Sequence, residues 1–302
     1  MQEMFYFRDV QSKIVYSSRE EFFATYNPQQ KWSLPDSIIY NIAKNPKNAK
    51  IYQKLIQSSK YFFVKNPIIV AERLCIRKDH AILNKYLNMP CVTSKFWITD
   101  KFENASKMLD LKSTPILISS FIPQLYRNDA AYLYLRGQII SYNQFMFISS
   151  NAQHIVLNET VVKDDDGSVV PLEKLVAILS KAKDIEFYDS IPSTITENTV
   201  TELLKLPHFS TIDKFEFHNI PETFDIETLF NYIKTNKYTN FVFWFGGSIS
   251  EGYKNRIEAI MDEILETKDH EYKLPYFRGN EINEEKWMKV YSLYVKQKNN
   301  NL

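Results

Sequence analysis

Apolar and polar residues alternate in five short stretches between residues 131 and 245, and a helical pattern follows each stretch. In every stretch two apolar residues stand two positions apart, so a pleated strand directs both to one face of a sheet. Equivalent apolar positions are separated by 22, 30, 30 and 26 residues, as in stacked repeats, whose period is roughly 20 to 50 residues. The predicted strands are Tyr132–Arg136, His154–Asn158, Asp184–Tyr188, Lys214–His218 and Asn240–Trp244, aligned on Leu135, Leu157, Phe187, Phe217 and Phe243.

The segments between these strands have the periodicity of amphipathic helices. Ser141 and Gln144 form a capping box, in which two side chains satisfy free amides at a helix start. Apolar stripes at i, i+3, i+4 and i+7 include Leu172, Leu175, Val176 and Leu179, and then Ile226, Leu229, Phe230 and Ile233. Because the crossovers are short, this alternation predicts an α/β fold with parallel strands on one face and helices on the other.

The chain before the repeats predicts a helical module. Ser33 can cap a helix in which Pro35 occupies the first turn without losing a hydrogen bond. A second helix follows Asn45-Pro46 and ends at Asn66-Pro67. We expect further helices over 67–74, 76–90 and 102–109, a strand at 96–98, an ordered arm over 1–30, and a last strand, a terminal helix and a frayed tail over 271–302.

Part of this module is similar to an F-box. The matching features are Leu34-Pro35, the aliphatic pair Ile38-Ile39, and the Ser58-Ser59-Lys60-Tyr61 segment, with Tyr61-Phe62-Phe63 where the family usually has Trp. Together with Phe224–Glu227 and Ile249–Lys254, they resemble a large nematode family of F-box-like proteins over about residues 31–266. The resemblance implies docking onto the adaptor subunit of an SCF (cullin-type) ubiquitin ligase. The residues it implies for that contact are Leu34, Pro35, Ile38, Ile39, Ile42, Leu55 and Phe62.

The repeats resemble an irregular leucine-rich-repeat solenoid. Such repeats place an Asn three residues after the second strand Leu, whereas this chain has Gln138, Thr160, Ser190, Ile220 and Gly246. We therefore expect the turns to satisfy their amides in another way. The domain organisation predicted is an arm (1–30), an F-box-like module (31–95), a leucine-rich-repeat-like domain (96–270) and a C-terminal cap and tail (271–302).

The residues between the apolar pairs form the open face of the predicted sheet. They are rich in Tyr, Trp, Arg and His, the residue types enriched at interface hot spots, although strands also favour aromatic residues for their intrinsic propensity. Curved repeat sheets are extended binding surfaces, so we predict that this face binds a protein. The residues predicted to bind are Tyr132, Tyr134, Arg136, Asn158, Glu186, Tyr188, Glu216, His218 and Trp244.

Composition narrows the class of protein. The 302 residues are 44% hydrophobic and 15% aromatic, which is typical of a folded domain and not of a disordered chain. Two cysteines cannot build a disulfide framework, and neither a signal peptide nor a long apolar span is present. We therefore expect a cytoplasmic or nuclear protein without membrane association. The net charge of +1 divides into +9 over residues 1–150 and −8 over residues 151–302.

Candidate chemistry is sparse. Asp164-Asp165-Asp166-Gly167 resembles part of a calcium loop, but Val162 stands where the first ligand belongs, so an Asp-Gly turn is favoured. Gly246–Ser250 could bind phosphate at a helix start, although it fits better as a tight connection with Ser250 as N-cap. The five histidines lack metal-ligand spacing. We predict no cofactor, no metal and no enzymatic activity.

The hypothesis drawn from the sequence is a non-enzymatic adaptor that joins an unidentified protein substrate to an SCF adaptor subunit. The alternative is a stand-alone repeat scaffold in which the F-box-like helices only cap the repeats. Residues 31–90 carry 11 basic and 3 acidic side chains, which raises RNA binding as a third hypothesis. It is disfavoured because an interleaved aromatic platform and a recognisable reading helix are both lacking.

Overall fold

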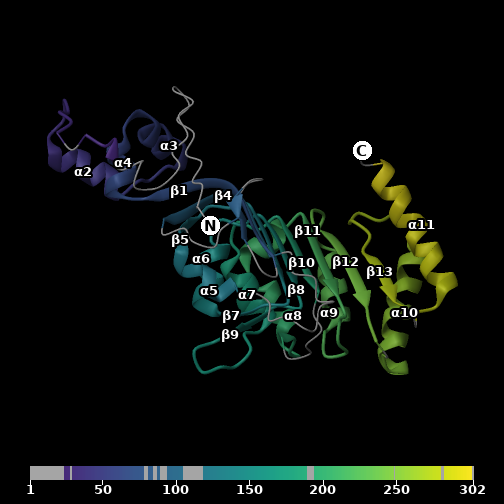
Figure 1. Ribbon diagram of the computed structural model, residues 1–302. Coiled ribbons are helices and arrows are strands. Elements are labelled where there is room, and N and C mark those ends of the chain that lie inside the picture. The colour runs from purple at the N-terminus through teal and green to yellow at the C-terminus, as the bar shows by residue number, and fades with distance from the viewer. Residues whose placement is uncertain are drawn as a thin grey trace.

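The computed structural model describes residues 24–27, 29–77, 81–83, 87–88, 94–104, 118–188, 194–247, 249–279 and 282–300. The predicted arm over residues 1–30 lies almost wholly outside these ranges. The described chain is an α/β protein built on one mostly parallel sheet, as predicted (Figure 1). Within the described chain, no helix has the length and apolar character needed to cross a bilayer.

The parallel strands that form most of the main sheet are added in chain order, each beside the parallel strand before it. Eight of them run parallel: β1 (Ile68–Ile76), β4 (Lys95–Asn104), β6 (Tyr132–Arg136), β8 (His154–Asn158), β10 (Asp184–Tyr188), β11 (Lys214–His218), β12 (Asn240–Phe245) and β13 (Tyr276–Gly279). Short strands β2 (Ala81–Leu83) and β3 (Leu87–Asn88) extend the β1 edge in antiparallel fashion, and β5 (Leu125–Asn128) pairs with β4.

Helices cover one face of this sheet (Figure 1). They are α5 (Ile118–Phe121), α6 (Tyr142–Ser149), α7 (Leu172–Ile178), α8 (Thr199–Leu204), α9 (Ile226–Ile233) and α10 (Glu251–Glu266), with 3-10 turns η1 (Ile122–Gln124) and η3 (Pro207–Thr211). Strands β7 (Ile139–Ser141) and β9 (Val161–Lys163) form a second, two-stranded sheet. The apolar stripes of the helices and the inward residues of the strands form one continuous core.

The strand alignment made from the sequence is the register of the structure. Leu135 pairs with Leu157, Leu157 with Phe187, Phe187 with Phe217, and Phe217 with Phe243. All five are at most 4% exposed, and burial of each such side chain contributes roughly 1.5–3 kcal/mol. The five strands predicted in this region are therefore confirmed.

The helix starts also follow the sequence. The predicted capping box of α6 is present, with Ser141 and Gln144 each bonded to the other's backbone amide. Ser250 caps α10 by accepting a hydrogen bond from the amide of Tyr253. The Asp-Gly segment forms a turn in which Gly167 has a φ of 84° and its amide donates to the Asp164 carbonyl.

Strand ends use a left-handed residue and side-chain hydrogen bonds where an Asn ladder is lacking. Gly137, Glu159 and Asn219 stand at equivalent positions after β6, β8 and β11, with φ values of 59°, 50° and 58°. Gln138, which is 1% exposed, donates to the carbonyls of Arg136 and Gly137 and accepts from the amide of Ile118. The turn amides themselves donate to the backbone of the next strand, Gly137 to the Asn158 carbonyl and Glu159 to the Tyr188 carbonyl, so the expectation that these turns satisfy their amides in another way is confirmed there.

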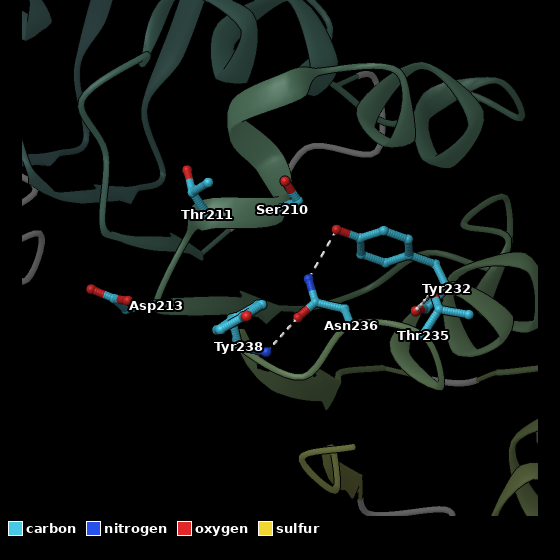
Figure 2. A pocket seen from close by; sticks show the side chains of 7 residues that line it. All are labelled: Ser210, Thr211, Asp213, Tyr232, Thr235, Asn236 and Tyr238. Atoms are coloured by element: carbon cyan, nitrogen blue, oxygen red, sulfur yellow. Dashed lines mark hydrogen bonds between the residues drawn. The ribbon is translucent and has the colours of Figure 1, made fainter. Parts of the chain in front are cut away.

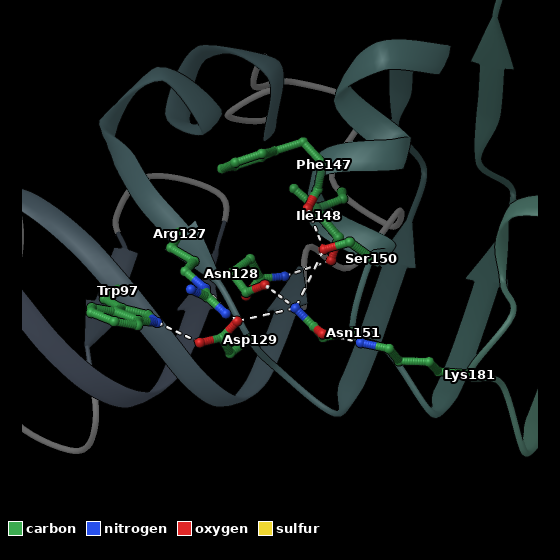
Figure 3. A network of polar contacts seen from close by, with 9 residues as sticks. All are labelled: Trp97, Arg127, Asn128, Asp129, Phe147, Ile148, Ser150, Asn151 and Lys181. Atoms are coloured by element: carbon green, nitrogen blue, oxygen red, sulfur yellow. Dashed lines mark hydrogen bonds and ion pairs between the residues drawn. The ribbon is translucent and has the colours of Figure 1, made fainter. Parts of the chain in front are cut away.

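At the opposite, amino ends of the strands, polar side chains join neighbouring turns (Figure 3). The Trp97 indole donates to Asp129 at 2.7 Å, and Arg127 pairs with the other carboxylate oxygen of Asp129 at 2.7 Å. Asn151 donates to that same oxygen at 3.0 Å and accepts a hydrogen bond from Lys181 at 2.5 Å. This network ties β4, the end of β5 and the next two turns together.

Three helix predictions in the first third of the chain are wrong. Residues 68–74 belong to strand β1, residues 81–83 to β2, and residues 102–104 to the end of β4. Residues 105–109 lie outside the described ranges. The apolar run Ile68-Ile69-Val70 fits a helix or a buried strand equally well by periodicity, and the pairing of β1 with β4 decides for the strand.

The helical module consists of α2 (Asp36–Lys44), α3 (Ala49–Ser58) and α4 (Lys60–Lys65). The predicted second helix is divided at Ser59, whose side chain accepts from the Tyr61 amide and starts α4. The module packs on the sheet face opposite α5–α10, because Trp97 joins its apolar cluster whereas the neighbouring Phe96 and Ile98 join the main core. That cluster comprises Ile39, Ala43, Tyr52, Phe62, Ile68 and Trp97.

Helix α11 (Glu284–Asn300) closes the other end of the sheet (Figure 1). It contacts α10 through Lys286, which pairs with Asp262 at 2.7 Å, and β13 through Tyr291, whose ring lies 5.7 Å from that of Tyr276. The predicted terminal helix and last strand are confirmed. The predicted tail is helical as far as Asn300.

Candidate functional site

Parallel register arranges the open face of the sheet in three rows that cross the strands. The amino-end row is Lys101, Tyr132, His154, Asp184, Lys214 and Asn240. The middle row is Glu103, Tyr134, Val156, Glu186, Glu216, Val242 and Tyr276. The carboxyl-end row is Arg136, Asn158, Tyr188, His218, Trp244 and Arg278.

All nine residues predicted to bind a partner lie in these rows. Eight of them are half-buried, and Glu216 is buried at 9% exposure. The structure adds residues that sequence reasoning missed: Lys101 and Glu103 from β4, and Tyr276 and Arg278 from β13. The alternation in Tyr276–Gly279 was the available signal for β13. For β4, the predicted helix over 102–109 hid the strand.

Ion pairs connect the amino-end and middle rows. The Lys214 ammonium lies 2.9 Å from Glu186 and 2.6 Å from Glu216, and His218 Nε2 lies 2.7 Å from the other oxygen of Glu216. Burial favours the neutral carboxyl of Glu216, but the hydrogen bonds from His218 and Lys214 outweigh it, so the pKa of Glu216 lies below its usual value. The two carboxylates of this cluster therefore share the Lys214 ammonium, and His218 supplies a further hydrogen bond to Glu216.

The amino-end row is similarly paired. The Lys101 ammonium lies 4.3 Å from the Tyr132 ring centroid and 2.7 Å from Glu103. His154 Nδ1 lies 2.6 Å from Asp184. These contacts link β4 to β6 and β8 to β10 at the surface.

A stack of rings runs along the carboxyl-end row. The His218 ring lies between Tyr188 and Trp244, at centroid distances of 3.9 and 5.0 Å and interplanar angles of 18° and 13°. The Arg278 guanidinium continues the stack 4.9 Å above Trp244. Burial, and then the nearby Glu186 and Glu216 carboxylates, raise the pKa of Tyr188 to about 12, so its hydroxyl stays protonated at neutral pH.

Helical elements border the open face at both ends. At one end the helical module packs on β1 and β4 through Trp97 and Ile68. At the other end, the Tyr294 hydroxyl of α11 reaches the Asn240 side chain at 3.4 Å, and Tyr291 and Tyr294 both touch Tyr276. The face between these borders combines aromatic edges with ion pairs in its amino-end and middle rows, which suits contact with a polypeptide.

The seven residues implied by the F-box resemblance divide into two groups. Leu34, Pro35, Ile38 and Ile42 are exposed, and Leu55 is half-buried. Ile39 and Phe62 are buried in the cluster with Trp97, at 6% and 2% exposure. Those two side chains hold the helices on the sheet, so a docked protein could touch only the other five.

The exposed group forms one apolar surface, which we name the α2–α3 face. Leu34, Ile38, Ile42 and Ile51 are 47%, 46%, 37% and 59% exposed. Beside them lies a hollow of about 300 Å³, lined by both helices and the loop that joins them, with Ile42, Ile51 and Leu55 in its wall. A surface of this kind commonly marks a docking site.

A pocket of about 420 Å³ opens on the amino-end side of the sheet (Figure 2). Its Asn236 side chain donates to the Tyr232 hydroxyl at 2.9 Å and to Thr239 Oγ1 at 3.0 Å, and its oxygen accepts from the Tyr238 and Thr239 amides. The central polar group is thus satisfied within the protein. Among the described residues, no group of three or more His, Cys, Asp or Glu side chains could hold a metal ion.

No family model, curated protein or solved structure matches the chain.

Proposed function

We propose that the protein is a non-enzymatic adaptor with two binding surfaces, located in the cytoplasm or nucleus. In this proposal the α2–α3 face docks onto an SCF adaptor subunit as an F-box does. The repeats, interpreted as an irregular leucine-rich-repeat-like solenoid, hold a protein substrate on the open face. The function is then proximity, because holding a substrate beside the ligase raises the effective concentration of its lysines there.

The observation that supports this proposal most is where exposed apolar side chains occur. Of the eleven large hydrophobic residues exposed in the described chain, five lie between residues 34 and 51. They are carried by a module that is held to the sheet by its own small core, so the exposed side chains are not required for packing. Exposed apolar groups concentrated in this way favour a second protein as their partner.

The open face supports the second part of the proposal. It is bordered by the helical module at one end and by α11 at the other, so a protein bound there would lie close to a ligase docked on α2 and α3. The rows present Tyr, Trp, His and Arg side chains, the types that anchor protein interfaces.

A pull-down with the purified SCF adaptor subunit tests the docking surface. We expect the wild type to bind, and a Leu34→Ala/Ile38→Ala/Ile42→Ala variant to lose at least tenfold in affinity. These side chains are exposed, so the variant is expected to fold, as circular dichroism would check.

The matched control is an Ile139→Ala/Met146→Ala/Phe147→Ala variant, which removes three apolar side chains that are exposed to similar extents (55%, 38% and 38%) near α6. It is expected to bind like the wild type. Absence of binding by the wild type would contradict the ligase proposal and favour the stand-alone scaffold, in which the helical module only caps the sheet.

A further inference from the structure

Unpaired hydrogen-bond donors gather at the carboxyl-end row. In the described chain, five buried side-chain polar atoms lack a partner, and three of them are donors: Arg136 Nε, Trp244 Nε1 and Trp287 Nε1. Arg136 and Trp244 belong to the row itself. Trp287, on α11, lies beside it, because the Arg278 guanidinium is 4.9 Å from the Trp244 ring and 5.9 Å from the Trp287 ring. A buried donor without an acceptor costs roughly 1–3 kcal/mol, so this end of the face favours a ligand that supplies acceptors.

Charge is also unbalanced in this row. The two lysines of the amino-end row are paired with carboxylates: Lys101 with Glu103, and Lys214 with Glu186 and Glu216. In the described ranges no carboxylate lies within 4 Å of the guanidinium groups of Arg136 and Arg278. Arg136 is half-buried and Arg278 is exposed. Among the described residues, no carboxylate pairs with either positive charge.

Two carboxylates near the row do not fill this role. Glu216 already accepts hydrogen bonds from Lys214 and His218. Glu159, which follows β8, has one buried carboxylate oxygen without a partner, and it forms no ion pair with Arg136. Within the described ranges, the carboxyl-end row thus has a guanidinium without a carboxylate partner near each end and a row of aromatic rings between the two.

The separation of the two arginines sets the size of a ligand. Arg136 on β6 and Arg278 on β13 are five strands apart, which at about 4.8 Å per strand spacing is about 24 Å. An extended polypeptide of about seven residues covers that distance at roughly 3.3 Å per residue. Between the arginines such a segment would cross Tyr188, His218 and Trp244, whose edges offer apolar contact and N–H or O–H donors.

We propose that the carboxyl-end row binds an acidic linear segment of a protein partner, with carboxylates at Arg136 and Arg278 and apolar side chains over the ring stack between them. This inference rests on the proposed function, because it gives the chemistry of the protein held on the open face. Bidentate contact with a carboxylate is the geometry that arginine favours.

Fluorescence anisotropy with a fluorescein-labelled decapeptide of alternating glutamate and leucine tests the proposal with the full chain. We expect saturable binding at 50 mM salt, at least tenfold tighter than that of the matching lysine and leucine peptide. An Arg136→Gln/Arg278→Gln variant is expected to lose at least tenfold in affinity. Its thermal unfolding should stay close to that of the wild type, because among the described residues neither guanidinium is ion-paired and the variant loses only the stacking of Arg278 on Trp244 and Trp287.

The control is an Arg256→Gln/Lys254→Gln variant, which removes two cations from α10 on the helical side and should change the affinity less than twofold. Three results would overturn the proposal: undetectable binding of the acidic peptide at 1 mM, equal losses in the two double variants, or tighter binding of an oligouridine probe, which would indicate RNA. The assay contains no ligase subunit, so its outcome is independent of the docking test on the α2–α3 face.

Discussion

Replacing Trp97 with phenylalanine should loosen the joint between the helical module and the sheet. Trp97 is fully buried, its indole donates to Asp129 at 2.7 Å, and it is the β4 member of the cluster that contains Ile39, Tyr52 and Phe62. Phenylalanine keeps most of the ring contacts but removes the N–H donor and part of the buried area.

The expected loss follows from these two terms. A hydrogen bond to a charged acceptor contributes roughly 1.5–3 kcal/mol, and the smaller ring gives up roughly 1 kcal/mol of burial. The variant should therefore be less stable by about 3 kcal/mol. Asp129 keeps Arg127 and Asn151 as partners, so its carboxylate is not left unpaired and a larger loss is not expected.

Urea unfolding followed by circular dichroism measures this loss, and a double-mutant cycle with Asp129→Ala, which removes the acceptor, isolates the hydrogen bond. Trp32→Phe is the matched control. Trp32 is half-buried and contacts the rings of Tyr61 and Phe62 at centroid distances of 5.3 and 5.5 Å, so its loss should stay below about 1 kcal/mol. Equal stability of Trp97→Phe and wild type, or a coupling energy near zero in the cycle, would refute the reasoning.

Three further substitutions test the sheet and its strand ends. Glu216→Gln should lower the free energy of unfolding by about 2 kcal/mol at pH 7, because it removes the carboxylate that pairs with the Lys214 ammonium. Because the pKa of Glu216 is lower in the folded state, its ionised carboxylate stabilises the fold above the unfolded-state pKa, and this stabilisation is lost as the pH falls through the folded-state pKa. Urea unfolding at pH 7, 5 and 3 should therefore show the difference in free energy of unfolding between variant and wild type becoming smaller. Gly246→Ala places a Cβ 2.1 Å from the Asn219 Oδ1 atom, so we expect it to lower the free energy of unfolding by about 1–2 kcal/mol. Adding Asn219→Gly should restore that stability, and a double variant as unstable as Gly246→Ala alone would contradict the steric argument. Glu159→Gly removes a non-glycine residue with a φ of 50° and its buried unpaired oxygen, so thermal unfolding should show a gain of about 1 kcal/mol, and a loss would show that the Glu159 side chain stabilises the fold.

The repeats were the predictable part of the fold because their information is local. Two apolar residues at a spacing of two fix which face of a strand is buried, and the capping residues Ser141 and Ser250 fix where helices begin. The composition of the open face followed from the same alternation, since any residue between two inward positions must face outward.

The sequence by itself determined the parallel order of the central strands, their register and the residues available on the open face, because each of these depends on periodicity within about thirty residues. Only the tertiary structure decided that Ile68–Ile76 is a strand, since a short apolar run is compatible with a helix until a partner such as β4 supplies its hydrogen bonds. It also decided which side chains of the helical module are free. Ile38 and Ile39 are adjacent and equally apolar, yet the contact with Trp97 buries one and leaves the other exposed. That Arg136 and Arg278 have no carboxylate partner among the described residues is likewise a property of the assembled rows, because ion pairing depends on distances across strands that the sequence does not contain.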